Sequence, residues 1–155
     1  MNTTQKFLLT AFVLFVAACS SVSSDRTNDA TAISASASGA YSDAGLTSNN
    51  IVYFAYDRSD INAEGRSKIR TLAKVINDNN LSVRIEGHCD ERGTREYNLA
   101  LGERRANAAK DYLMTYGVSS DRIKVLSYGK ERPVDSGSNP LSWSKNRRSV
   151  TVKAN

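Results

Sequence analysis

The apolar residues after position 50 follow two spacings, one typical of strands and the other typical of helices. Residues 51–56 are β-branched or aromatic apart from one alanine, which predicts a first strand. Farther along, apolar residues recur at the i, i+3, i+4 and i+7 spacing of an amphipathic helix, at Ile69, Leu72, Ala73 and Ile76. Asn62 is the expected N-cap of this helix, and the polar run 77–80 is expected to end it.

A second strand and a long second helix follow. Apolar and polar residues alternate over 83–88, which predicts the strand. Gly93 permits a tight turn, Thr94 is the expected N-cap, and Gly117 suits the position just after the helix. The expected buried stripe of this helix consists of Tyr97, Leu101, Ala108, Tyr112 and Tyr116. Helical spacing adds position 104 or 105 to the stripe, and both are arginine.

The C-terminal residues predict two more strands and a short helical turn. Residues 123–127 alternate as a third strand before a turn at Gly129, and residues 142–146 are expected to form the helical turn. Residues 148–153 are the expected last strand, with Val150 and Val152 on one face. Strands that alternate with helices predict one α/β (α+β) domain over residues 51–155, a mixed four-stranded sheet with helices packed against it.

The N-terminus predicts export and lipid attachment. Residues 1–18 carry Lys6 and then a short apolar stretch, which is typical of a signal peptide and too short to span a bilayer. Val16-Ala17-Ala18-Cys19 resembles the bacterial lipobox, which implies that Cys19 is acylated and becomes the new N-terminus. The resemblance also implies the outer membrane, because Ser20 rather than aspartate follows the cysteine. The alternative is an ordinary signal peptide with an incidental cysteine.

The segment after the signal has a different composition. Residues 19–50 are rich in Ser, Ala, Thr, Asn, Asp and Gly and show no apolar period, which is typical of a flexible tether. A disordered processing remnant would have the same composition, and only the lipobox favours a tether.

Charge and cysteine content narrow the possible functions. The formal net charge is +5, but acidic residues are interleaved with the basic ones, so nucleic acid is not an expected partner. Only two cysteines are present, and a lipidated Cys19 leaves Cys89 without an intramolecular partner. The globular part therefore depends on its hydrophobic core for stability.

The run 87–106 carries the most specific chemistry. An arginine on the core side of a helix is costly unless something pairs with it, and Asp90 across the turn is the expected partner. A carboxylate and a guanidinium that face one cleft suit the ammonium and carboxylate of an amino acid. A buried ion pair that only fixes the turn to the helix is the alternative.

Several blocks of sequence resemble the OmpA-like peptidoglycan-binding domain, and most closely the lipoproteins of that family. The blocks, in order, are residues 52–57, 86–94, 97–106, 127–129 and 145–148. The resemblance implies that Asp90 and Arg105 hold the diaminopimelate of a peptidoglycan stem peptide. Many family members have Thr or Asn where this chain has Cys89.

The resemblance also implies further ligand contacts. Tyr56 is expected to pack on the aliphatic part of the ligand, and Asp57 to hydrogen-bond the ligand or only to cap the following turn. Asn98 is expected to contact the ligand or to brace the loop of Asp90, and Arg104 belongs with the ligand-binding candidates. For the arginines at 147 and 148, a solvated face is the preferred interpretation, and added positive potential for carboxylates is the alternative for Arg147.

The run 88–91 also suggests a metal site or a cysteine hydrolase, and neither interpretation is favoured. Neighbouring residues of a strand point to opposite faces, so four adjacent side chains do not surround one ion. A catalytic Cys–His pair normally comes from distant residues. Cys89 is therefore expected to be a half-buried thiol and His88 a packed residue, with no metal or other cofactor and no catalytic residue.

The predicted function is a non-enzymatic link between the outer membrane and the cell wall. The lipid on Cys19 holds one end in the membrane while the domain faces the periplasm and binds peptidoglycan. Lipoproteins of this family also bind the periplasmic protein TolB and act with the Tol proteins in envelope integrity and cell division. The alternatives are a generic wall anchor without a Tol partner and a peptidoglycan-modifying enzyme.

Overall fold

The computed structural model describes Leu46 and residues 48–154, which belong to the unit of the chain formed by residues 38–155. The signal peptide, Cys19 and most of the predicted tether lie outside the described residues. The elements are η1 (Ser48–Asn50), β1 (Ile51–Tyr53), α1 (Ala63–Asp78), β2 (Val83–His88), α2 (Arg95–Thr115), η2 (Ser120–Arg122), β3 (Ile123–Gly129), α3 (Pro140–Asn146) and β4 (Arg148–Lys153).

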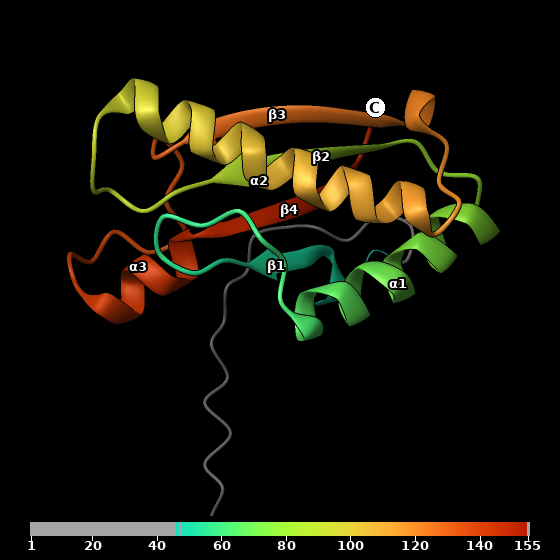
Figure 1. Ribbon diagram of the computed structural model, residues 1–155, viewed down its shortest axis with the longest axis horizontal. Coiled ribbons are helices and arrows are strands. Elements are labelled where there is room, and N and C mark those ends of the chain that lie inside the picture. The colour runs from blue at the N-terminus through green and yellow to red at the C-terminus, as the bar shows by residue number, and fades with distance from the viewer. Residues whose placement is uncertain (1–45, 47, 155) are drawn as a thin grey trace, which may run out of the picture. The chain divides into compact units, whose positions relative to one another are not determined.

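The strands form one sheet in the order β1-β4-β2-β3. β2 and β3 are parallel, and β4 is antiparallel to both β1 and β2. α1 and α2 lie side by side over one face of the sheet, and α3 lies beyond the end where β4 begins (Figure 1). This arrangement confirms the predicted mixed four-stranded sheet with helices packed against it. Within the described residues, no helix has the length and apolar character needed to cross a membrane.

α1 forms as its sequence predicts. Asn62 caps it by accepting a hydrogen bond from the Gly65 amide at 2.8 Å, because its side-chain oxygen replaces a missing helical acceptor. The predicted apolar stripe is buried in full and packs in the core, whose members include Ile69, Leu72, Ala73 and Ile76.

The buried stripe of α2 differs from the predicted one. The structure buries Asn98, Leu101, Gly102, Arg105, Ala106, Ala109 and Leu113. Tyr97 was predicted inside but is 45% exposed, so that part of the prediction is wrong. Ala108, Tyr112 and Tyr116 pack against the core only at its margin.

The reason for the shifted stripe is a close backbone approach between α2 and β2. A Cβ atom added to Gly87 would lie 1.8 Å from the carbonyl oxygen of Gly102. Only small residues permit such contact, so the glycine and alanine side of α2 faces the sheet and the tyrosines lie to the side. This approach brings the middle of α2 down onto the end of β2.

The ends of α2 follow the predicted capping. Thr94 accepts a hydrogen bond from the Tyr97 amide at 3.2 Å. Gly117 has φ +85°, a conformation that favours glycine, and the Val118 amide donates to the Leu113 carbonyl at 3.1 Å. Val118 is buried, so the chain folds back onto the last turn of the helix as expected.

The first strand is shorter than predicted, ending at Tyr53 instead of residue 56. The next residues form a turn in which the Arg58 amide donates to the Ala55 carbonyl at 3.3 Å. The folded part begins before residue 51, since Leu46 is buried and Asn50 donates from its side chain to the Thr151 carbonyl at 3.2 Å.

Burial on β4 extends over both faces at the start of the strand. Ser149 and Thr151 pair in register with Gly87 and Ile85, which face the helices. Val150 and Val152 therefore share the opposite face, as predicted.

His88, the single histidine of the chain, ends β2 with its ring 5.5 Å from that of Tyr128. It is 3% exposed, and its Nδ1 atom has no hydrogen-bond partner among the residues that the structure describes. Burial, reinforced by the charge of Arg148, lowers the pKa of His88 to about 3. The folded protein therefore keeps this histidine neutral at pH values where the unfolded chain protonates it.

We predict that acid weakens the fold through His88. The pKa of His88 is lower in the folded protein than in the unfolded chain. The burial of neutral His88 therefore costs no stability above about pH 6.5, and the free energy of unfolding falls as the pH drops from there toward 3. Between pH 6.5 and pH 5 the loss is roughly 2 kcal/mol. Urea unfolding at pH 7, 6 and 5 measures it, and His88→Asn flattens the dependence. An equal slope in both proteins would contradict the assignment.

Candidate functional site

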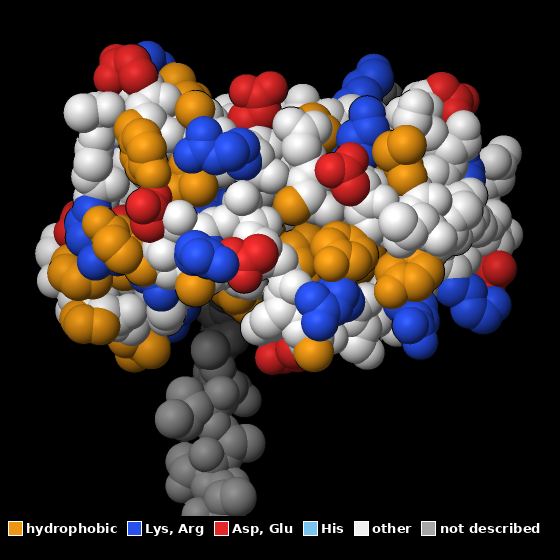
Figure 2. Space-filling view, viewed as in Figure 1, with side chains coloured by type: hydrophobic (Ala, Val, Ile, Leu, Met, Phe, Trp, Pro, Cys, Tyr) orange, Lys and Arg blue, Asp and Glu red, His pale blue; other side chains and the backbone are white. Residues whose placement is uncertain are grey.

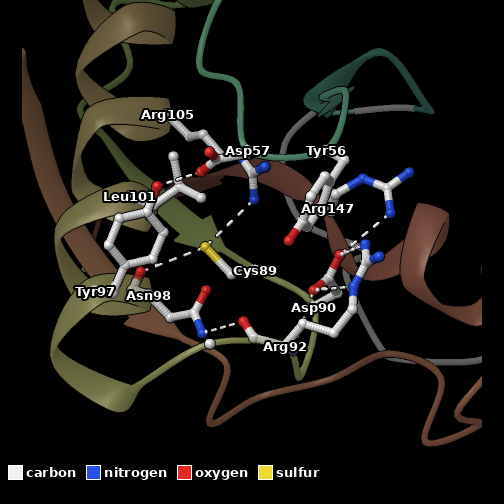
Figure 3. Close-up of a pocket in the computed structure, with 11 residues that line it drawn as sticks. Tyr56, Asp57, Cys89, Asp90, Arg92, Tyr97, Asn98, Leu101, Arg105 and Arg147 are labelled. Atoms are coloured by element: carbon white, nitrogen blue, oxygen red, sulfur yellow. Dashed lines mark hydrogen bonds and ion pairs between the residues drawn. The ribbon is translucent and has the colours of Figure 1, made fainter.

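A pocket of about 200 Å³ opens where the end of β2, the first half of α2 and the turn after β1 meet (Figure 3). The close approach of Gly87 to Gly102 brings α2 onto the end of β2 here. The lining combines carboxylates, guanidinium groups and aromatic rings: Tyr56, Asp57, Cys89, Asp90, Arg92, Gly93, Tyr97, Asn98, Leu101, Arg105 and Arg147.

Arg105 lies at the floor of the pocket and is 0% exposed. Its Nε donates to the Arg58 carbonyl at 2.9 Å and its Nη2 to the Ala55 carbonyl at 3.1 Å. Its Nη1 donates to the His88 carbonyl at 2.8 Å. One side chain of α2 therefore holds the turn after β1 and the end of β2 in place.

The charge of Arg105 has no carboxylate in contact with it among the described residues, since its hydrogen bonds go to three carbonyls and a thiol. Burial lowers the pKa of the Arg105 guanidinium, while the nearby charge of Asp90 opposes that shift. A buried cation surrounded by neutral acceptors is costly. Such a cost is typical of a site that a charged ligand completes.

Asp90 is 4% exposed and is bound by two other arginines. Arg92 donates to it from Nη2 at 2.7 Å and from Nε at 3.2 Å, and Arg147 donates from Nη1 at 3.2 Å. The Arg92 amide adds a fourth bond at 3.2 Å. Burial alone would raise the pKa of Asp90, but the hydrogen bonds from Arg92 and Arg147 hold it below its usual value.

The prediction that Asp90 pairs directly with Arg105 is therefore wrong. Arg105 points toward Cys89 and the carbonyls beneath it, whereas Arg92 and Arg147 point at Asp90 (Figure 3). The physical reason is that carbonyl groups at the ends of β1 and β2 already bind the guanidinium of Arg105. Both residues still line the same pocket, as their spacing predicts.

Tyr56 and Asp57 form the rim opposite α2. Asp57 has φ +55°, a conformation that is uncommon for residues other than glycine. Its carboxylate accepts a hydrogen bond from the hydroxyl of Tyr97, and this bond raises the pKa of Tyr97. Tyr56 is 60% exposed, which leaves its ring open to a ligand.

Asn98 and Cys89 connect the floor to the loop of Asp90. The Asn98 side chain donates to the Arg92 carbonyl at 2.8 Å and to the Thr94 carbonyl at 3.1 Å, so it braces this loop. Cys89 was expected to be half-buried but is 3% exposed, because it lies beneath Asn98 and donates to its carbonyl at 3.3 Å. Burial raises the pKa of the Cys89 thiol.

The other predicted arginines have different positions. Arg147 lines the pocket and bonds to Asp90, and Arg148 is buried, so the solvated-face interpretation is wrong for both. Arg147 follows the last residue of α3, and Arg148 is the first residue of β4. Arg104 is exposed beside the pocket, with its guanidinium 5.9 Å from the Tyr97 ring.

Sequence reasoning assigned no role to Arg92 or Trp143, although both are part of the site. The guanidinium carbon of Arg92 lies 4.0 Å from the ring centroid of Tyr56 and 4.2 Å from that of Trp143. Arg92 lies within the run 87–106, but the contact with Trp143 depends on the tertiary fold. A local sequence pattern could not have predicted it.

The surface outside the pocket does not indicate a particular class of binding partner. On the helix face, lysine and arginine side chains alternate with acidic ones and do not form a single basic patch (Figure 2). No cluster of three or more His, Cys, Asp or Glu side chains suited to a metal ion occurs in Leu46 or residues 48–154.

Comparison with known proteins adds independent information. The model of the OmpA family matches residues 53–147. The peptidoglycan-associated lipoprotein of Pseudomonas aeruginosa is 48% identical over 106 residues, which covers 68% of this chain and 63% of that protein. The peptidoglycan-associated lipoprotein of Pseudomonas putida is 41% identical over 154 residues, or 92% of this chain and 93% of that protein.

Solved structures agree in fold. The peptidoglycan-associated lipoprotein of Burkholderia pseudomallei has a TM-score of 0.66 and 36% identity, and the match covers 68% of this chain and 90% of that one. The OmpA-like domain of FopA1 from Francisella tularensis has a TM-score of 0.57 and 31% identity, over 68% of this chain and 74% of that one. The matched region of the family contains the whole pocket, from Tyr56 to Arg147. This chain belongs to the OmpA family.

Proposed function

We propose that the domain binds peptidoglycan and that the pocket receives the diaminopimelate of a stem peptide. The observation that carries this proposal is the buried Arg105 guanidinium, which binds no carboxylate of Leu46 or residues 48–154, in one pocket with Asp57 and Asp90. Diaminopimelate ends in an ammonium and a carboxylate on one carbon, so it needs both signs of charge close together. Relatives named peptidoglycan-associated lipoproteins support the choice of ligand.

The roles of the pocket residues follow from their positions. Asp90 and Arg105 form the clamp, with Asp90 supplying negative charge and Arg105 positive charge at the floor. Asp57 adds an exposed carboxylate at the rim, where an entering ammonium meets it first. Tyr56 covers the aliphatic stem, and Asn98 keeps the loop of Asp90 in shape.

Binding without catalysis is the function that fits these groups. The buried Cys89 thiol has a raised pKa, which disfavours a nucleophilic thiolate. His88 lies against Tyr128, and its pKa of about 3 makes it too weak a base to deprotonate Cys89. A peptidoglycan-modifying enzyme would release new wall fragments on incubation with purified peptidoglycan, and we expect none.

The proposed anchor is a lipid on Cys19 in the inner leaflet of the outer membrane. The domain then lies in the periplasm, where it links the membrane to the wall. Its similarity to peptidoglycan-associated lipoproteins supports a further role with TolB and the other Tol proteins in envelope integrity and cell division. Wall anchoring without a Tol partner is the simpler form of the same proposal.

We predict that the clamp residues determine affinity for the wall. Asp90→Asn and Arg105→Gln each remove one charge and leave its surroundings unbalanced, which typically costs about 2–5 kcal/mol. Binding of a diaminopimelate-containing stem peptide, measured by calorimetry, should weaken roughly 30-fold or more.

Asp111→Asn is the control for this prediction, because it removes an exposed carboxylate from the same helix outside the pocket. Melting curves are recorded for every variant, since both clamp residues also support the fold. Variants of Asp90 and Arg105 that melt and bind like the wild type would place the binding site elsewhere.

We predict that Cys19 is the acylated first residue of the mature protein. Mass spectrometry of protein extracted from membranes should show an N-terminal peptide that begins at Cys19 and carries acyl chains. Cys19→Ser should abolish both the acylation and the membrane fraction of the protein. A mature chain that begins elsewhere and carries no lipid would rule out the anchor.

A further inference from the structure

Arg92 is held by two aromatic rings and by a carboxylate. Its guanidinium carbon lies over the rings of Tyr56 and Trp143, at 4.0 Å and 4.2 Å from the ring centroids. Asp90 binds the edge formed by Nε and Nη2. An arginine side chain loses rotamer entropy when it is fixed, so this arrangement carries a cost.

A second layer of contacts fixes the residues around Arg92. The indole Nε1 of Trp143 donates to Glu91 Oε1 at 2.9 Å, and the Ser138 hydroxyl donates to Glu91 Oε2 at 3.0 Å. Lys130 donates to the carbonyls of Glu91 at 3.2 Å and Gly93 at 2.8 Å. These contacts therefore hold both Trp143 and the loop that carries Arg92 in place.

The remaining edge of this guanidinium is open. No hydrogen bond joins Nη1 of Arg92 to another of the described residues, and the Arg92 side chain is 33% exposed at the pocket. Arg147 binds the same Oδ2 atom of Asp90 and also lines the pocket (Figure 3). Two guanidinium groups thus bind one carboxylate.

We infer that Arg92 and Arg147 form a second anion subsite, which binds a peptide carboxylate next to the diaminopimelate. This inference rests on the proposed function. The free α-carboxylate of the γ-linked glutamate that precedes diaminopimelate has the required charge and is one residue away. The open edge of Arg92 suits a planar carboxylate, and the aromatic faces keep that edge aimed at the ligand.

A purely structural role for Arg92 would need only its bond to Asp90. The stacked rings add nothing to that bond, but they limit the motion of the guanidinium and so reduce the entropy lost on binding. The Arg92 side chain is 33% exposed and that of Arg147 is 15% exposed, so a second carboxylate reaches these two cations from solvent.

The test is a cycle of two changes, one in the protein and one in the ligand. The probes are the tripeptide L-Ala-γ-D-Glu-diaminopimelate and the same peptide with the glutamate α-carboxylate amidated. Calorimetry on the full chain should show that amidation weakens binding to wild type about tenfold or more. Arg92→Gln should bind the free acid about as weakly as wild type binds the amide, and should not distinguish the two peptides.

Two further variants keep the test decisive. Trp143→Leu retains both arginines but removes one stacked ring, so it should lose part of the discrimination between the peptides. Arg70→Gln is the matched control, because this arginine lies 5.4 Å from the Tyr116 ring and outside the pocket. It should bind both peptides like the wild type.

The outcomes separate the two proposals. An Arg92→Gln protein that still binds the free acid at least tenfold more tightly than the amide would overturn the subsite. Tighter binding by Arg92→Gln would also overturn it, and would show that Arg92 competes with the ligand for Asp90. If wild-type protein binds neither peptide, the proposed function itself fails, and the subsite with it.

Discussion

The site depends on the burial of one guanidinium, that of Arg105. Its hydrogen bonds to the carbonyls of Ala55, Arg58 and His88 join the turn after β1 to the end of β2. Because the cation is withdrawn from water without a carboxylate in contact, its burial costs stability. The close packing of Gly87 on Gly102 makes the burial possible, since it brings α2 within reach of both segments. The pocket forms above this cation.

The two carboxylates of the pocket have different partners. Asp90 binds Arg92 and Arg147, whereas Asp57 accepts a hydrogen bond from the hydroxyl of Tyr97. The result is a small cleft with separate regions of positive and negative potential. Such a cleft suits a zwitterionic group better than a simple ion, and a stem peptide carries both a zwitterion and further carboxylates.

The parts of the fold that local chemistry determines were predictable from the sequence. Asn62 and Thr94 cap the helices as expected, and the apolar spacing of α1 matches its buried face. Predictions were wrong where packing at a distance decides the outcome. Tyr97 faces solvent because small residues of α2 take the contact with the sheet. Arg147 enters the pocket because α3 brings it beside Asp90. The motif around Asp90 and Arg105 located the pocket but not its ion pairs.

The most direct test of the account is an NMR titration that follows the side-chain N–H groups of the pocket. The account predicts that a diaminopimelate-containing tripeptide shifts the Nε–H signal of Arg105 and the side-chain amide of Asn98 in a saturable way. The Nε–H signal of Arg122, which lies near the end of α1, should stay in place. Saturable shifts confined to residues outside the pocket, with Arg105 and Asn98 unchanged, would contradict the account.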